Sequence, residues 1–102
     1  MSWQRVANVA DVEEDEAFPV SVGKTLIALV KQGDQVHCIS NVCTHEFALL
    51  SDGIVEDGCI ECPLHQARFD VATGQLKSGP SCNSLKTFPV KVEDGEVLVD
   101  CG

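Results

Sequence analysis

Short turns that contain glycine constrain the fold of this chain more than any other feature. Glycine readily adopts the positive φ angles that two-residue hairpin turns require, and apolar segments flank these turns. The sequence therefore predicts a series of β-hairpins. Their turns are Gly33-Asp34, Asp57-Gly58, Thr73-Gly74 and Asp94-Gly95.

The expected strands are short and lie next to these turns. Residues 24–31 are predicted to pair with 35–39, 54–56 with 59–61, 68–71 with 75–77, and 86–92 with 96–100. Helix is expected only as a single turn within residues 9–17. Many short strands with frequent glycine turns predict an all-β fold, a sandwich or small barrel. We expect residues 1–102 to form a single domain.

The chain is strongly acidic. It has 7 Lys plus Arg and 16 Asp plus Glu among 102 residues, which gives a formal net charge of −9. This charge repels nucleic acid and anionic membranes, and it favours a partner with a basic patch. The same acidity is also explained if it only keeps a small protein soluble, and the charge alone leaves both interpretations open. No apolar run approaches the roughly 20 residues of a membrane span, and the N-terminus lacks a secretory pattern. These features predict a cytoplasmic protein with no nucleic-acid or membrane partner.

Two short segments each place a cysteine close to a histidine. They are Cys43-Thr44-His45 and, after sixteen intervening residues, Cys62-Pro63-Leu64-His65. Each follows an expected strand, and Pro63 cannot donate a ladder hydrogen bond, so the chain is expected to leave the sheet there. Both segments are therefore predicted to be loops at one end of a β scaffold.

The donor atoms of these segments suit a metal. Thiolate and neutral imidazole bind zinc, and they also bind iron in iron-sulfur clusters, so the donor types alone leave both possibilities open. In a reducing cytoplasm, metal ligation or burial is more probable for the six cysteines than disulfide bonds. The order Cys-His, Cys-His differs from that of common zinc fingers, in which two cysteines precede two histidines.

At these two motifs, with Gly79-Pro80-Ser81 further along, the chain resembles the Rieske iron-sulfur family. The resemblance implies an antiparallel β-sandwich with two cluster-binding loops at one end, and one [2Fe-2S] cluster per chain. Cys43 and Cys62 would hold one iron, and His45 and His65 the other. The length and the closing segment 88–100 are similar to the free-standing ferredoxins of bacterial aromatic-ring-hydroxylating dioxygenases.

This resemblance implies an electron carrier of aromatic hydrocarbon catabolism and not an enzyme. Electrons would come from an NAD(P)H-dependent ferredoxin reductase and pass to a terminal oxygenase, both docking transiently at the His45/His65 end. Once these two histidines are ligands, only His37 remains, so the chain cannot supply the two histidines of a mononuclear oxygenase iron. It also lacks the G-x-G-x-x-G motif of a dinucleotide-binding turn.

The chain departs from other members of the family at several positions. Ala48 and Leu64 replace the cysteines that form a disulfide in high-potential relatives, and Ala67 and Phe69 replace a serine and a tyrosine that donate hydrogen bonds there. Without these donors, we expect a potential toward the low end of the roughly −150 to +300 mV range of Rieske centres. Many relatives have glycine after each histidine, where this chain has Glu46 and Gln66. Their effect is left open.

The remaining cysteines have simpler interpretations. Cys38, Cys59 and Cys82 are expected to be buried as small apolar residues, and Cys101 to be a surface thiol. His37 is interpreted as structural. A four-cysteine site made of Cys38, Cys43, Cys59 and Cys62 is a minor alternative.

Two functional alternatives complete the sequence-based predictions. One is a zinc-stabilised β domain that only mediates interactions. The other keeps the iron-sulfur cluster in an accessory subunit of another reductase, resembling the small subunits of nitrite reductases.

Overall fold

The structure, a computed structural model, describes residues 3–42, 49–63, 67–79 and 84–101. Within these ranges, strands form three antiparallel sheets with the orders β1-β10-β9, β2-β3-β4 and β5-β6-β7-β8. The strands are β1 (Gln4–Asn8), β2 (Ala17–Val22), β3 (Thr25–Gln32), β4 (Gln35–Ser40), β5 (Ile54–Glu56), β6 (Cys59–Glu61), β7 (Arg68–Asp70), β8 (Leu76–Ser78), β9 (Val90–Glu93) and β10 (Glu96–Val99). Two short 3-10 helices, η1 (Val9–Asp11) and η2 (Leu50–Asp52), are the helical elements of the described part.

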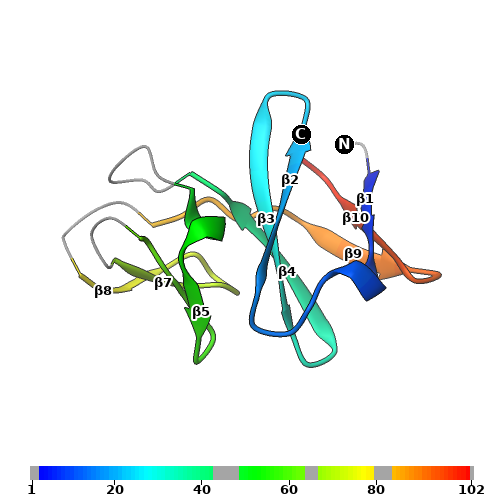
Figure 1. Cartoon of the computed structure of the whole chain (residues 1–102). Helices are drawn as coiled ribbons and strands as arrows, with labels where there is room; N and C mark the ends of the chain where they lie inside the picture. The colour runs from blue at the N-terminus through cyan, green and yellow to red at the C-terminus, as the bar shows by residue number, and fades with distance from the viewer. Residues whose placement is uncertain (1–2, 43–48, 64–66, 80–83, 102) are drawn as a thin grey trace.

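The sheet β2-β3-β4 lies between the other two sheets. Figure 1 shows β1, β9 and β10 on one side of it and β5, β7 and β8 on the other. Four successive residues of β3, Ile27 to Val30, are completely buried, and they alternate between the two faces of the sheet. The apolar run that the sequence placed in this strand is therefore explained by burial on both faces.

The two faces of the central sheet contribute to two separate cores. Ile27 and Leu29 pack with residues of β1 and β10, including Val97. Ala28 and Val30 pack with residues of the sheet β5-β6-β7-β8, including Phe69. Strand β3 thus joins the half of the molecule that contains the chain ends to the half that contains Cys62.

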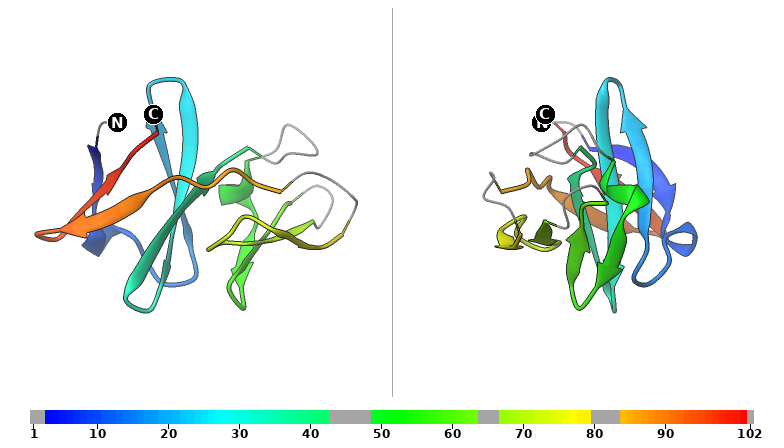
Figure 2. Two further views of the ribbon diagram at one scale, coloured as in Figure 1. Left: turned by 180° about the vertical axis from the view of Figure 1, so that it is seen from behind. Right: turned by 60° about the vertical axis from the view of Figure 1, so that its left-hand side comes forward.

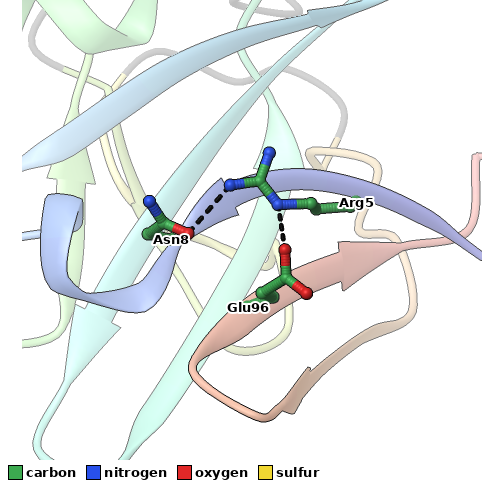
Figure 3. Close-up of polar contacts among 3 residues, drawn as sticks. All are labelled: Arg5, Asn8 and Glu96. Atoms are coloured by element: carbon green, nitrogen blue, oxygen red, sulfur yellow. Dashed lines mark hydrogen bonds and ion pairs between the residues drawn. The ribbon is translucent and has the colours of Figure 1, made fainter.

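The first described strand is held against the last one. Strand β1 pairs antiparallel with β10, and the Arg5 guanidinium forms an ion pair with Glu96 and donates a hydrogen bond to Asn8 Oδ1 at 2.8 Å (Figure 3). The Arg5 and Glu96 side chains are 52% and 44% exposed, so this pair adds little to stability. The apolar contacts beneath the strands provide most of the attachment.

The predicted all-β, antiparallel fold is confirmed. Each of the four glycine turns joins two strands that pair with each other or sit next to each other in a sheet. The strand before the last turn begins at Val90 and not at residue 86. The single helical turn expected within residues 9–17 is η1, and it is followed by β2, which the sequence analysis missed together with β1. No helix of the described residues is long and apolar enough to cross a membrane.

Candidate metal centre

Cys62 is the one predicted ligand that falls within the described residues. Cys43, His45 and His65 lie outside them, as do Glu46, Leu64, Gln66 and Pro80. The described residues that adjoin these segments show how each segment is anchored. Their positions therefore show from which part of the fold the candidate site is built.

Cys62 is positioned by the end of β6. Side chains alternate along this strand, so Ile60 and Cys62 are fully buried while Glu61 between them is half-buried. The strand ends at Glu61, and Pro63 follows Cys62, as predicted. The Cys62 N–H donates to the Ala67 carbonyl at 2.8 Å and thereby closes the base of the intervening segment. Cys62 is thus fixed where the second predicted loop begins.

Asn41 anchors the segment that contains Cys43 and His45. Its carbonyl accepts a hydrogen bond from Leu50 N–H at 2.8 Å, and Val42 and Leu49 form an antiparallel bridge. The Asn41 side chain accepts a hydrogen bond from Ser51 N–H at 2.8 Å and donates one to Ser51 Oγ at 3.0 Å. The base of the first segment is therefore closed by both backbone and side-chain bonds.

Gly74 anchors the chain that follows the segment 80–83. The Leu85 N–H donates to the Gly74 carbonyl at 2.7 Å, and Leu85 is buried in the same core as Cys62. Gly74 has a φ of +78°, and a Cβ there would lie 2.2 Å from the Leu85 carbonyl oxygen. Only glycine fits this close approach.

The three anchoring contacts, at Cys62, Asn41 and Gly74, lie in the same part of the molecule. In Figures 1 and 2 the described chain on either side of each gap lies on the side of the central sheet that carries β5, β7 and β8, away from β1, β9 and β10. The prediction that both Cys-His segments leave from one end of the scaffold therefore agrees with where their described neighbours lie. The segments themselves are outside the described residues.

The other described cysteines do not join Cys62. Cys38 packs in the core against β1 and β10, and burial, with a smaller contribution from Cys101, raises the pKa of its thiol to about 12. This core is separate from the core that contains Cys62 and lies against the other face of the central sheet. Cys59 begins β6 and is half-buried, whereas Ile60, the next residue of the strand, points into the core that contains Cys62. These positions argue against the four-cysteine alternative, and the described residues contain no group of three potential metal ligands.

The predictions for the remaining cysteines are partly correct. Cys38 is buried as expected, but Cys59 is only half-buried. Cys101 is also half-buried and packs against the core of β1 and β10, so the thiol expected at the surface is partly shielded. Burial is the main reason that the pKa of Cys101 is raised, followed by the charge of Asp100, while Lys86 lowers it. Cys82 lies outside the described residues.

His37 has a partner that supports a structural role. Its Nε2 lies 2.9 Å from the Gln32 Oε1, across the hairpin of β3 and β4. This contact places the His37 side chain within the hairpin of β3 and β4.

The surroundings of Cys62 contain no hydroxyl at the two positions singled out in the sequence. Ala67 and Phe69 are both fully buried in the same core as Cys62. A buried cysteine at the start of a closed loop, within an apolar core, suits a thiolate that is shielded from water by a bound group. Together with a second sulfur and two imidazoles, the donor set fits a mixed-ligand [2Fe-2S] cluster.

Comparison with known proteins decides between iron and zinc. The Rieske [2Fe-2S] domain matches residues 2–89. The chain belongs to this family. The cofactor of this Rieske protein is accordingly a [2Fe-2S] cluster, as expected from the resemblance.

Its relatives include separate ferredoxins. The anthranilate 1,2-dioxygenase ferredoxin subunit of Burkholderia cepacia is 37% identical over 98% of this chain and 93% of its own length. The ferredoxin of Sphingomonas yanoikuyae B1 has a similar structure, with a TM-score of 0.93 and 37% identity over 99% of this chain and 100% of that chain. A chain in the complex of reduced oxygenase and oxidized ferredoxin in carbazole 1,9a-dioxygenase matches with a TM-score of 0.88 and 37% identity, covering 95% of this chain and 91% of that chain.

Asn41 and Gly53 are features of the site that the sequence analysis missed. Asn41 is the last residue before Val42-Cys43, and it follows a buried strand, where a polar residue that can bond back to the chain is a signal for an anchored turn. Gly53 follows η2, and a Cβ there would lie 1.8 Å from the Glu61 carbonyl oxygen, directly before Cys62. The contact adjoins the Ile54–Glu61 pair of the predicted hairpin, but no sequence pattern reveals how closely the two backbones approach.

Proposed function

We propose that this chain is the electron-transfer ferredoxin of an aromatic-ring-hydroxylating dioxygenase system. In this proposal it carries single electrons in the cytoplasm from an NAD(P)H-dependent reductase to a terminal oxygenase. The observation that carries the proposal is the similarity to dioxygenase ferredoxins over nearly the full length of both proteins. The oxygenase partner is supported by the likeness to a ferredoxin chain in a complex with an oxygenase.

The proposed ligands are Cys43 and Cys62 for one iron and His45 and His65 for the other, within a single domain of residues 1–102. The cluster, when bound, accepts and releases one electron. Two ferric ions, two sulfides and two thiolates sum to zero charge with neutral imidazoles, so the reduced centre carries a single negative charge. This small change in charge suits a carrier that must be both reduced and oxidised readily.

The protein surface determines how partners approach. The net charge of −9 favours encounter with basic patches on both partners, and the His45/His65 end is the proposed docking face. Contacts of this kind are small and transient, so the carrier can leave one partner for the other.

The first experiment asks which metal is bound and by what. The purified protein is expected to contain two irons and two acid-labile sulfides per chain, and its dithionite-reduced form to give the electron paramagnetic resonance spectrum of mixed nitrogen and sulfur ligation. His45→Ala and His65→Ala should lose that spectrum, whereas the matched control His37→Ala should keep it. A colourless zinc protein, or retention of the spectrum by both ligand variants, would refute the proposed site.

The second experiment asks which system the protein serves. NADH- or NADPH-dependent oxidation of an aromatic substrate by a purified reductase and oxygenase should require this protein. Support of nitrite reduction in place of aromatic oxidation would favour the accessory-subunit alternative.

A further inference from the structure

A stretch of three consecutive residues, 51–53, contacts the bases of both Cys-His segments through its first and last members. At the start of this stretch, Ser51 is bonded through its N–H and its Oγ to the side chain of Asn41, two residues before Cys43. At its end, the Gly53 backbone packs so closely on the Glu61 carbonyl that a Cβ would lie 1.8 Å away. Glu61 directly precedes Cys62. The segment η2 and Gly53 therefore span the interval between the two bases.

The polar groups of Asn41 are all engaged. Its N–H donates to the Leu26 carbonyl at 2.9 Å and its carbonyl accepts from Leu50 N–H at 2.8 Å, in addition to the two side-chain bonds with Ser51. Asn41 is only 3% exposed. A buried amide is costly unless it is hydrogen-bonded, and removal of the Asn41 side chain leaves the N–H and Oγ of half-buried Ser51 without these partners.

Two other side-chain contacts lie away from both bases. The Arg5–Asn8 bond is exposed and lies on β1, which belongs to the half of the molecule away from Cys62 (Figure 3). The His37–Gln32 contact lies across a hairpin. At the base that leads to Cys43, Ser40 Oγ accepts only a local hydrogen bond from Val42 N–H at 3.4 Å, whereas the Asn41 side chain bonds to Ser51 across the base.

We propose that Asn41 is a positioning residue for the cluster, and that through Ser51 and Gly53 it fixes the separation between the base that leads to Cys43 and the base that leads to Cys62. The inference rests on the ligand set of the proposed function. Two thiolates can hold one iron only if their backbones stand at a set separation, so a rigid connection between the bases lowers the ordering cost of cluster binding. The connection also resists the opening that precedes cluster loss.

The test compares Asn41→Ala, Ser51→Ala and the wild type as iron-loaded proteins. Iron transfer to a chelator is followed in conditions where circular dichroism shows that each variant stays folded. Loss of two part-buried hydrogen bonds should make iron release from Asn41→Ala about 5- to 30-fold faster than from wild type. Ser51→Ala keeps its own N–H bond to Asn41 and should fall between the two. The reduced Asn41→Ala protein should also show a broadened electron paramagnetic resonance spectrum.

Two controls separate positioning from general stability. Asn8→Ala makes the same substitution at an asparagine that also accepts a hydrogen bond, but on β1. Val97→Ala removes buried methyl groups from the core on the far side of the central sheet. Both should keep the wild-type spectrum and release rate well below their melting temperatures, even if Val97→Ala melts as early as Asn41→Ala.

The outcomes distinguish this inference from the proposed function. The inference is supported if Asn41→Ala, and neither control variant, releases iron rapidly or has an altered spectrum. It is also supported if Asn41→Ala is purified without iron while Val97→Ala retains its iron. Equal release rates in Asn41→Ala and a Val97→Ala protein of the same melting temperature overturn the inference but leave the ferredoxin proposal intact. A wild-type protein without iron and sulfide overturns both.

Discussion

Substitution of Gly53 by alanine tests whether the close approach to β6 shapes the site. The backbone of Gly53 has a φ of −93°, which any residue adopts, so an alanine there suffers no backbone strain. Its Cβ, however, would lie 1.8 Å from the Glu61 carbonyl oxygen and 3.2 Å from the Leu50 carbonyl oxygen. Strand β6 pairs with β5 on one side and β7 on the other, so Glu61 cannot move away without disturbing a ladder.

The expected magnitude follows from this clash. Overpacking in a well-ordered site costs about 1–3 kcal/mol, and a shift of more than 1 Å belongs at the upper end. Reduced freedom of the unfolded chain returns about 0.4–1 kcal/mol for a glycine-to-alanine change. The net loss should be about 2 kcal/mol, which lowers the melting temperature of a domain of this size by about 8–16 °C.

The assay is thermal unfolding by circular dichroism of iron-loaded Gly53→Ala and Gly23→Ala at one scan rate. Gly23 has a φ of +61° and open space around it, so its substitution costs only the left-handed backbone strain, about 1 kcal/mol. Gly53→Ala should melt well below Gly23→Ala, and it alone should alter the visible spectrum, because Glu61 precedes Cys62. A Gly53→Ala protein that melts within 2–3 °C of wild type, about 0.5 kcal/mol on the same scale, would show that the clash is relieved without cost and that our reasoning is wrong.

Three further predictions concern the potential, pH and salt. Ala67→Ser should raise the midpoint potential by about 40 mV in spectroelectrochemical titration, since a hydroxyl bonded about 1 kcal/mol more strongly to the reduced centre favours that state; an unchanged or lower potential counts against a donor position beside Cys62. The raised pKa of Cys38 keeps its thiol protonated in the folded state, so from about pH 9 upward the unfolded state loses the proton first and the free energy of unfolding falls, by up to about 4 kcal/mol at pH 12. Urea titrations of wild type and Cys38→Ala between pH 8 and pH 11 should therefore converge as the pH rises, and parallel curves contradict the assigned burial. Reduction by the reductase should slow about tenfold between low and high ionic strength in stopped-flow measurements, because salt screens the attraction of a −9 surface; a rate independent of salt excludes electrostatic steering.

The hairpins could be predicted from the sequence because their information is local. A glycine turn and the strands beside it occupy adjacent positions, so the turns at Gly33 and Gly58 were sufficient to locate two strand pairs. Strands β1 and β2 were missed for two different reasons. The partner of β1 is β10, at the other end of the chain, and β2 contains Pro19, which an edge strand tolerates but which argues against a strand in a sequence.

In the candidate site, too, features set by neighbouring residues could be predicted and features set by distant contacts could not. The place where the chain leaves β6 was predicted from Pro63, and Cys62 lies there, because proline acts on its own neighbours. The burial of Cys59 was predicted wrongly, since residues alternate along a strand and Ile60 occupies the inward position. Asn41 was missed because its contact with Ser51 joins segments that no spacing in the sequence pairs. Gly53 was missed because the predicted hairpin does not reveal how closely its backbone approaches Glu61.

The double burial of β3 has a consequence for engineering chimeric carriers. Ala28 and Val30 face the core that contains Cys62, whereas Ile27 and Leu29 face the core beneath β1 and β10. A graft of the half that contains Cys62 from a relative must therefore bring the relative's counterparts of Ala28 and Val30, while Ile27 and Leu29 of the host are retained. A crossover point placed before or after β3 cannot satisfy both requirements, so compatible hybrids call for interleaved substitutions within a single strand.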